Sequence, residues 1–268
     1  HRHLLTMPLR EGILLVGTGR AAHHLGHAIA RAGLPLAGVV GRAVHSAKPL
    51  ALALRTTPFG LDERLPPAAL TLLAVSDDAI APVAARIGAR EGVVAHLSGA
   101  SDMDRLLPHA HRGVLWPVMS LSPGEPADLS HVPLVVDANG DEARRVLLDL
   151  ARSLSGKVVE LPLDQRRLVH LAAVFASNFP VALFAEARTL LENGGIAPDL
   201  LTPLWKATAA KAAAVGPDQA LTGPARRGDQ GTLARHLAAL AGDPDLRRAY
   251  ALLSDLIAKR HPRPPDGR

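Results

Sequence analysis

The stretch that most constrains the fold is residues 12–33. It starts with a short apolar run, Ile13–Val16, which is typical of a strand buried on both faces. A G-x-G-x-x-A pattern follows over residues 17–22. Beyond it, apolar residues recur three and four positions apart, as on the buried face of a helix that stops at Gly33. This order of strand, glycine-rich turn and helix predicts the first unit of a dinucleotide-binding fold.

The small residues in this turn each have a chemical reason. Gly17 permits a tight turn, Gly19 lets the backbone approach a pyrophosphate, and Ala22 is small enough for the helix to pack on its strand. The start of the helix offers unpaired N–H groups and the positive end of its dipole. An ordinary strand–turn–helix without a ligand is the alternative. The context favours a pyrophosphate site made by the first turn, namely Gly17, Thr18, Gly19, Arg20 and Ala21.

The end of the second expected strand, residues 36–40, bears on which cofactor binds. Folds that prefer NAD place an acidic residue here, which bonds the ribose 2′-hydroxyl. This chain has Gly41 and Arg42 instead, with a serine hydroxyl at Ser46. A guanidinium suits a 2′-phosphate because its planar fork makes bidentate, charge-assisted bonds. We therefore predict NADP rather than NAD, with Gly41 and Arg42 as binding residues; an exposed surface arginine is the alternative.

Alternating strand and helix patterns continue to residue 161. The runs 70–75, 92–97, 114–119, 132–136 and 157–161 read as strands, residues 45–54 and 141–154 as helices, and residues 56–67 as an irregular link. This alternation predicts an α/β fold, with an N-terminal Rossmann domain built on a doubly wound, mostly parallel sheet.

Polar residues follow two of these strands directly. Ser76 and Asp77 come after residues 70–75, and Ser98 and Gly99 come after residues 92–97. Ligands of such sheets bind outside the carboxyl ends of the strands, so we predict that these four residues shape the nicotinamide pocket. Ser76 or Asp77 could equally cap the next helix.

From residue 164 onward the pattern is helical only. Helices are expected over residues 164–193 (kinked or divided by Pro180), 198–215, 231–241 and 244–259, with a loop over 216–229. The chain is thus expected to hold an NADP-binding Rossmann domain (7–162), an all-α substrate and dimerisation domain (163–260) and a disordered tail (261–268).

Residues 168–185 carry no formal charge. A helix that is apolar nearly all round is more often buried in a helical domain or in a subunit interface than in a membrane. We therefore predict a homodimer through the helical domain and no membrane association.

Composition narrows the class of partner and the compartment. The formal net charge is +5, yet the basic residues are spread along the chain and aromatic residues make up only 3%. A nucleic-acid surface clusters its charge and adds stacking aromatics, so we expect a small-molecule substrate and no nucleic acid. The chain has no cysteine, which excludes disulfides and thiol catalysis. With no visible signal peptide, this is compatible with the cytoplasm.

Several motifs together resemble those of one known family. They are Val16-Gly-Thr-Gly-Arg-Ala-Ala22, Leu73-Ala-Val-Ser-Asp-Asp-Ala-Ile80, His96-Leu-Ser-Gly-Ala100, His170-Leu-Ala-Ala-Val-Phe-Ala-Ser-Asn178 and Leu221-Thr-Gly-Pro-Ala-Arg-Arg-Gly-Asp229. The chain resembles NADP-oxidoreductase-like proteins in which a helical domain of unknown function, family 2520, follows a Rossmann domain.

This resemblance implies kinship in fold with pyrroline-5-carboxylate reductases, 6-phosphogluconate dehydrogenases and deazaflavin-dependent NADP reductases. Such proteins build the active site between their domains and dimerise through the helical one. The chain departs from many family members at Trp116-Pro117, where they have His-Pro. A role for that imidazole cannot be transferred to this chain.

Two residues of the helical part are candidates for proton chemistry. His170 has an intrinsic pKa suited to acid–base catalysis, and Asn178 lies on the same broad face of the expected helix. The alternative is a buried histidine and asparagine bonded to the backbone. Arg227 could hold an anionic substrate or be a solvated surface residue. The pairs His23/His27 and His109/His111 lack a third ligand at suitable spacing, so no metal is expected.

These patterns predict an NADP(H)-dependent oxidoreductase. It would transfer a hydride to or from a small carbonyl, imine, alcohol or amine substrate, with His170 and Asn178 as catalytic residues. The alternative is a sensor or interaction protein that binds NADP without turning anything over.

Overall fold

The computed structural model describes residue 9 and residues 11–262. The predicted tail, 261–268, therefore lies outside the described residues except for His261 and Pro262. The chain divides into two compact units, His1–Pro180 and Val181–Arg268. The first is called the sheet unit below and the second the helical unit, and each is described by itself.

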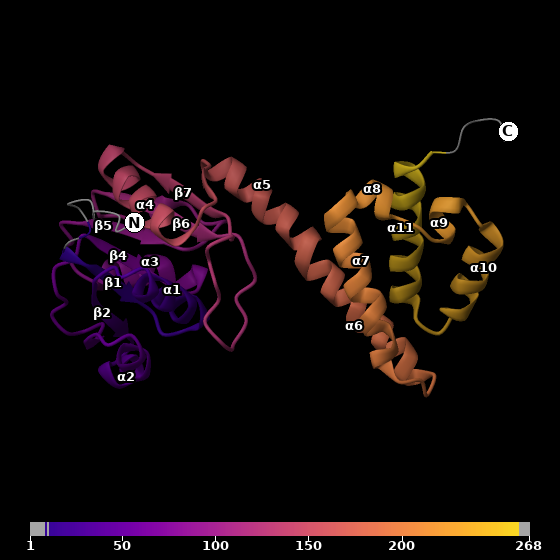
Figure 1. The fold of residues 1–268 in the computed structure, drawn as a ribbon, viewed down its shortest axis with the longest axis horizontal. Helices are drawn as coiled ribbons and strands as arrows, with labels where there is room; N and C mark the ends of the chain where they lie inside the picture. Colours follow the sequence, from indigo (N-terminus) through magenta and orange to yellow (C-terminus); the bar gives the residue numbers. More distant parts are fainter. Residues whose placement is uncertain (1–8, 10, 263–268) are drawn as a thin grey trace. The chain divides into compact units, whose positions relative to one another are not determined.

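The described part of the sheet unit contains one eight-stranded sheet (Figure 1). Its strands are β1 (Ile13–Val16), β2 (Leu36–Gly41), β3 (Pro58–Gly60), β4 (Leu70–Leu73), β5 (Val93–His96), β6 (Arg112–Pro117), β7 (Leu134–Ala138) and β8 (Val158–Glu160). Their order is β3-β2-β1-β4-β5-β6-β7-β8. All neighbours are parallel except β6 and β7, which are antiparallel. The predicted Rossmann-type α/β fold is confirmed.

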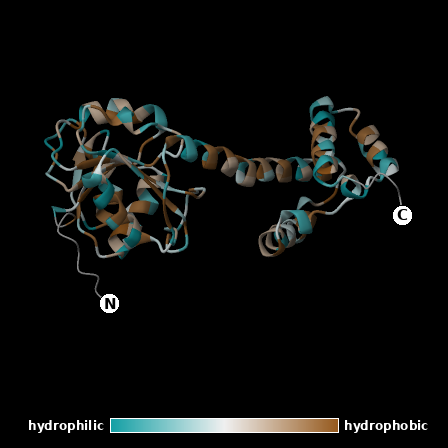
Figure 2. Ribbon diagram, turned by 90° about the horizontal axis from the view of Figure 1, so that it is seen from above, coloured by the Kyte–Doolittle hydropathy of each residue, from teal (hydrophilic) through white to brown (hydrophobic). Residues whose placement is uncertain are grey.

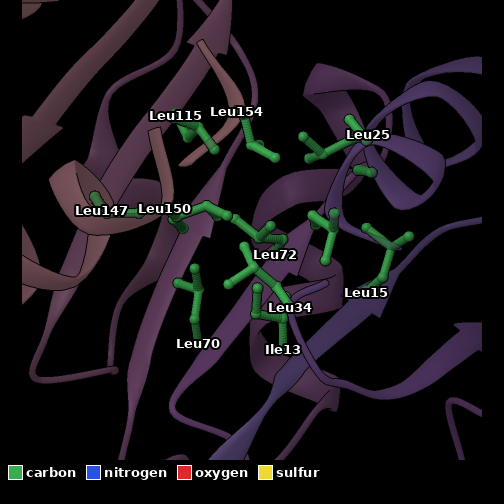
Figure 3. Packing of buried hydrophobic residues seen from close by; sticks show 14 of the residues in the cluster. Ile13, Leu15, Leu25, Leu34, Leu70, Leu72, Leu115, Leu147, Leu150 and Leu154 are labelled. Atoms are coloured by element: carbon green, nitrogen blue, oxygen red, sulfur yellow. The ribbon is translucent and has the colours of Figure 1, made fainter. Parts of the chain in front are cut away.

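Helices cover both faces of this sheet. They are α1 (Arg20–Arg31), α2 (Val44–Ala53), α3 (Ile80–Arg86) and α4 (Asp141–Leu154). Side chains of β1 alternate between two cores, as a doubly covered strand requires. Ile13 and Leu15 join leucines of α1 and α4 on one face, which Figure 3 shows from close by. Leu14 and Val16 pack with Ile80 and Val83 of α3 on the other.

The structure corrects the expected elements at a few points. The segment expected as an irregular link contains β3, three residues paired in parallel with β2 at the sheet edge. Ser76 occupies the N-cap of a short 3₁₀ turn, Asp77–Ala79, but its side chain makes no capping bond. The expected loop 216–229 contains two four-residue helices, α8 (Pro217–Ala220) and α9 (Pro224–Arg227), each with proline at its first position.

A long helical run leaves the sheet unit. It consists of α5 (Leu163–Ala173), a π turn (Val174–Asn178) and α6 (Phe179–Asn193). Pro180 has no N–H to donate, and its ring crowds the carbonyl four residues earlier. The π turn ends two residues before this proline, so the regular α-helical bonding is interrupted close to where division was expected. The sheet ends at β8, near the predicted boundary after residue 162, but the compact unit continues because α5 packs on the sheet.

The helical unit contains the rest of α6, then α7 (Thr202–Val215), α8, α9, α10 (Gln230–Ala239) and α11 (Pro244–Arg260). Asp243 caps α11 by accepting the N–H of Leu246 at 2.9 Å. Phe184 stacks on Trp205 with ring centroids 4.6 Å apart. Among the described residues of this unit, Ala225 alone is buried.

The run from α5 through α6 is strongly apolar, as the brown stretches of these helices in Figure 2 illustrate. Within the described residues, Leu163–Asn193 is the one helical run whose length and composition would suffice to cross a membrane. Many of its large apolar side chains are exposed in the single chain, including Leu168, Leu171, Phe175 and Val181.

Candidate functional site

A pocket of about 460 Å³ lies at the carboxyl ends of β1, β2 and β4. It brings together eight of the residues predicted to bind a cofactor: Gly17, Thr18, Gly19, Arg20, Ala21, Gly41, Arg42 and Ser76. This is the edge at which doubly wound sheets bind their ligands, beside the point where the strand order reverses.

The two glycines of the turn differ in why they must be glycine. Gly17 has φ +127°, and a Cβ there would lie 2.1 Å from the carbonyl oxygen of Ala74. At Gly19 a Cβ would meet nothing within 4 Å, so the missing side chain leaves bare backbone facing open space. Gly19 is also the N-cap of α1, which has no side-chain cap. The first N–H groups of α1 are therefore available to an anion, and the site fits a dinucleotide pyrophosphate.

Two cations line the same pocket. Arg20 begins α1 and Arg42 follows β2; both side chains are exposed, and neither is ion-paired within the described residues. The first turn of α2 contains no acidic residue. The Ser46 hydroxyl donates to the carbonyl of Ala43 at 2.7 Å and thus closes that turn. The pocket wall after β2 can accordingly bind a phosphate, which an acidic residue there would repel.

Beside the pocket, the loop after β5 is tied to Asp77. The hydroxyls of Ser98 and Ser101 donate to Asp77 Oδ2 at 2.8 and 3.1 Å. The N–H of Ser98 donates to His96 Nδ1 at 3.0 Å, and His96 Nε2 donates to the carbonyl of Asp102 at 3.3 Å. Burial lowers the pKa of His96 to about 4, so this imidazole is neutral at physiological pH.

Arg166 of α5 fastens the helix to this loop. Its side chain is fully buried, and Nη1 donates to the carbonyls of Ser98, Gly99 and Ser101 at 3.3, 3.0 and 3.0 Å. Nε and Nη2 both reach Asp137 Oδ2 of β7 at 3.2 Å. A buried guanidinium with this set of partners fixes the helix start against the ends of β5 and β7.

Trp116 connects the strand ends to α5. A Cβ at Gly99 would lie 2.5 Å from the Trp116 ring, so this glycine makes room for the indole. On its other side, the Trp116 ring lies 5.9 Å from the His170 ring, centroid to centroid. The indole is therefore packed between the loop after β5 and the helix that carries His170.

A second pocket, of about 580 Å³, lies against α5 and the π turn. Trp116, His170, Ser177 and Asn178 all line it, together with Met119 and Ser120 from the segment after β6. The Ser177 hydroxyl contacts the carbonyl of Ala173 at 2.7 Å and Asn178 Oδ1 at 3.1 Å. A π turn is an uncommon feature that is frequent at functional sites, and here it supplies both of these polar residues.

One loop borders both pockets. Met119 and Ser120 line the second pocket, whereas Leu121 lines the first. The loop continues along α1, where the nearly buried His24 holds it: Nε2 donates to the carbonyl of Ser122 at 2.7 Å, and Nδ1 accepts the N–H of Ala127 at 3.0 Å. This pair of bonds requires the neutral Nε2–H tautomer.

Comparison with known proteins places the chain in a family. The profile of a family described as "Domain of unknown function (DUF2520)" matches residues 132–257. A solved protein from Bacteroides fragilis, described as a candidate NADP oxidoreductase, is 33% identical with a TM-score of 0.83. That match covers 92% of this chain and 97% of the other. The chain belongs to the DUF2520 family. No curated protein matches its sequence.

The fold of this DUF2520 protein is shared with better known reductases. A 1-pyrroline-5-carboxylate reductase from Streptococcus pyogenes is 14% identical with a TM-score of 0.60, covering 92% of this chain and 98% of that one. A reductive aminase from Aspergillus terreus, solved with NADPH and ethyl-5-oxohexanoate, is 17% identical with a TM-score of 0.57. That match covers 93% of this chain and 89% of the other. The predicted kinship in fold with pyrroline-5-carboxylate reductases is thereby confirmed.

The predicted site residues of the DUF2520 protein fall into four groups. Eight of them line the first pocket. Asp77, Ser98 and Gly99 lie outside its lining and form the adjoining network, where the Asp77 carboxylate is held by two serine hydroxyls rather than capping a helix. His170 and Asn178 line the second pocket and are exposed, so they are not core residues of the single chain. Arg227 lies in the helical unit on α9 and is exposed.

Sequence reasoning missed Arg166 and His24. The hydrogen-bond partners of both residues are far away in the sequence. The carbonyls bonded to Arg166 are 65 to 68 residues before it, and the partners of His24 are 98 and 103 residues after it. Arg166 stands in a polar stretch with Asp164, Gln165 and Arg167 at the start of α5, so no local pattern distinguished it. Within the described residues, no group of three or more potential ligands forms a metal site.

Proposed function

We propose that this protein is an NADP(H)-dependent oxidoreductase. It would reduce a small carbonyl or imine compound, or oxidise the corresponding alcohol or amine. The observation that carries the proposal is the pairing of two pockets along one loop. The first offers bare backbone, a free helix start and two unpaired arginines, and the second offers an imidazole and an amide.

In this proposal each part of the chain has a separate task. Gly17 to Ala21 bind the pyrophosphate, and Arg42 binds the 2′-phosphate, which distinguishes NADP from NAD. The bound nicotinamide supplies or accepts the hydride. His170 gives a proton to the nascent alkoxide or amine, or takes one in reverse, through a ring nitrogen. The Asn178 amide donates a hydrogen bond that orients the reacting group.

The relatives support the reaction class. The Bacteroides fragilis protein is described as a candidate NADP oxidoreductase. The fungal aminase was solved with NADPH and a keto ester, and the streptococcal protein is a reductase of a cyclic imine acid. Support for NADP over NAD comes from this chain itself, in Arg42 and the acid-free turn after β2.

The proposal includes a homodimer and a cytoplasmic location. Exposed apolar side chains on α5, α6, α7 and α11 support association through the helical unit. Light scattering at micromolar concentration should give twice the chain mass. A monomer with both units folded would contradict the dimer.

The test is NADPH oxidation across a panel of ketones, keto acids, aldehydes and cyclic imines, with NADPH binding measured separately by calorimetry. We expect saturable oxidation with at least one class. Tight NADPH binding without turnover across the panel would contradict the enzyme and favour a sensor of NADP. Absence of NADPH binding would contradict both.

A further inference from the structure

The second pocket differs from the first in its charge. Among the twelve described residues that line it, none is Asp, Glu, Lys or Arg. Its apolar surface comes from the Trp116 ring, Met119, three valines, and three alanines of α5 and the π turn. The polar groups are neutral hydroxyl and amide groups and one imidazole. A ligand here meets an apolar wall and a few hydrogen-bonding groups, with His170 as the one titratable side chain.

The two arginines of α5 lie outside the lining of this pocket. Arg166 is fully buried, and its guanidinium donates hydrogen bonds to the Asp137 carboxylate and to three backbone carbonyls. Arg167, next along α5, is exposed, and its Nε donates to the carbonyl of Ala100 at 3.3 Å. Neither residue lines the pocket. A carboxylate that entered would give up part of its hydration where it meets Trp116 and the alanines, and no guanidinium or ammonium group of the lining would offset that loss.

We propose that this pocket binds uncharged ketones or imines with a compact apolar body, and that it discriminates against the same compounds bearing a carboxylate. The inference rests on the proposed function and deepens it by naming the substrate class. The apolar body would lie on Trp116 and the alanines, with the carbonyl oxygen or imine nitrogen at His170 and Asn178. A volume of about 580 Å³ is ample for such molecules.

The first experiment measures binding and does not depend on turnover. The chain has two tryptophans: Trp116 lines the pocket and Trp205 lies in the helical unit. In the full chain carrying Trp205→Phe, the tryptophan fluorescence therefore comes from Trp116. The protein is saturated with NADP⁺ at pH 8 and titrated with two matched pairs of compounds, and the quenching of Trp116 fluorescence measures their binding. These are 3-methyl-2-butanone against 3-methyl-2-oxobutanoate, and cyclohexyl methyl ketone against cyclohexylglyoxylate. In each pair a methyl group replaces a carboxylate.

We expect the neutral member of each pair to bind at least tenfold more tightly. Equal or tighter binding of the keto acids would overturn the proposal, and so would the absence of binding by either member up to its solubility. If Trp205→Phe lowers the yield of folded protein, calorimetry on the unmodified chain gives the same comparison.

A variant with an added positive charge tests whether the uncharged lining causes the preference for neutral ligands. Ala176 is an exposed pocket residue of the π turn, and Ala176→Arg places a cation in the lining. The variant should raise keto-acid affinity at least tenfold relative to the neutral partner. Ser153→Arg, on the exposed face of α4 and outside the pocket, adds the same charge and should leave the ratio unchanged. Equal changes in both variants would mean that net charge, and not the pocket, sets the preference.

Turnover separates this inference from the proposed function. NADPH oxidation with the neutral pair members, but not with keto acids, would support both. Preferred binding of neutral members without oxidation would keep the pocket assignment while contradicting the enzyme. Oxidation with keto acids at tenfold higher kcat/KM would establish an oxidoreductase and overturn the substrate class.

Discussion

At the scale of single residues, the surrounding backbone determines what each side chain can do. Gly17 and Gly99 were both assigned to the site from their place after a strand. Gly17 cannot carry a side chain because Ala74 is too close, whereas Gly99 makes room for the indole of Trp116. The same indole then contacts His170. Gly99 thus influences the second pocket through Trp116.

Replacing His170 by Asn should lower kcat about a hundredfold or more, the usual loss when a general acid is removed. The side chain is exposed and its ring contacts that of Trp116, so folding should be little affected. Stopped-flow turnover and NADPH titration are compared for the two proteins. Unchanged turnover with a lower melting temperature would make the histidine structural.

Replacing Arg42 by Ala should weaken NADPH binding by about 1–3 kcal/mol, the size of a lost charged hydrogen bond, and leave NADH binding nearly unchanged. Arg64→Ala, an exposed arginine outside the first pocket, serves as the matched control. Calorimetric titration with both cofactors measures the difference. Equal losses for NADPH and NADH would refute the role of Arg42.

The buried His96 makes folding stability depend on pH. Its pKa is lowered by burial to about 4, whereas a histidine in the unfolded chain titrates near 6.5. Above pH 6.5 neither state takes up the proton. As the pH falls from 6.5 toward 4, the unfolded chain alone binds it, which costs the folded state up to about 3 kcal/mol.

Urea unfolding at pH 7.5, 6.0 and 5.0 should therefore show stability falling with pH, and His96→Gln should flatten this dependence. The exposed His45→Gln is the control and should retain the wild-type slope. Identical slopes for all three proteins would show that another group is responsible.

At the scale of elements, one buried ion pair anchors α5. Removing Arg166 leaves the Asp137 carboxylate and three carbonyls without their partner, so Arg166→Met should destabilise the sheet unit by about 3–5 kcal/mol. Arg144→Met breaks an ion pair with Glu160 in which both side chains are about half exposed to solvent, so it should destabilise the protein much less than Arg166→Met. Urea unfolding compares the two, and similar losses would contradict the anchoring role.

Sequence patterns predicted the elements whose signals are local. The strands and helices of the sheet unit follow from apolar periodicity. Strand β3 was not predicted because a segment of three residues that begins with proline is too short to show a periodic apolar pattern. Helices α8 and α9 did have a signal, a glycine followed by proline at each start. The pockets were predicted in outline, but Arg166 depends on contacts between distant segments, which no local pattern encodes.

At the scale of the whole molecule, apolar surface is distributed unevenly between the units. The sheet unit buries its leucines in two clusters, one on each face of the sheet. In the helical unit, Ala225 is the single buried residue among those described, while Leu200, Leu204 and Leu252 are each more than 60% exposed. By itself, a chain segment that buries so little cannot offset the entropy of ordering its backbone.

Because the helical unit buries so little surface within one chain, its stability should depend on the protein concentration. If a second chain supplies the missing contacts, the helical unit folds and associates in one step, and its melting temperature rises with concentration. Calorimetric scans from 1 to 100 μM should show this shift. Leu204→Asp should lower the transition and abolish its concentration dependence; Leu52→Asp, at an 81% exposed leucine of the sheet unit, should do neither. Cells that make little of this protein would then hold it partly unfolded, so the amount synthesised would itself determine the active fraction.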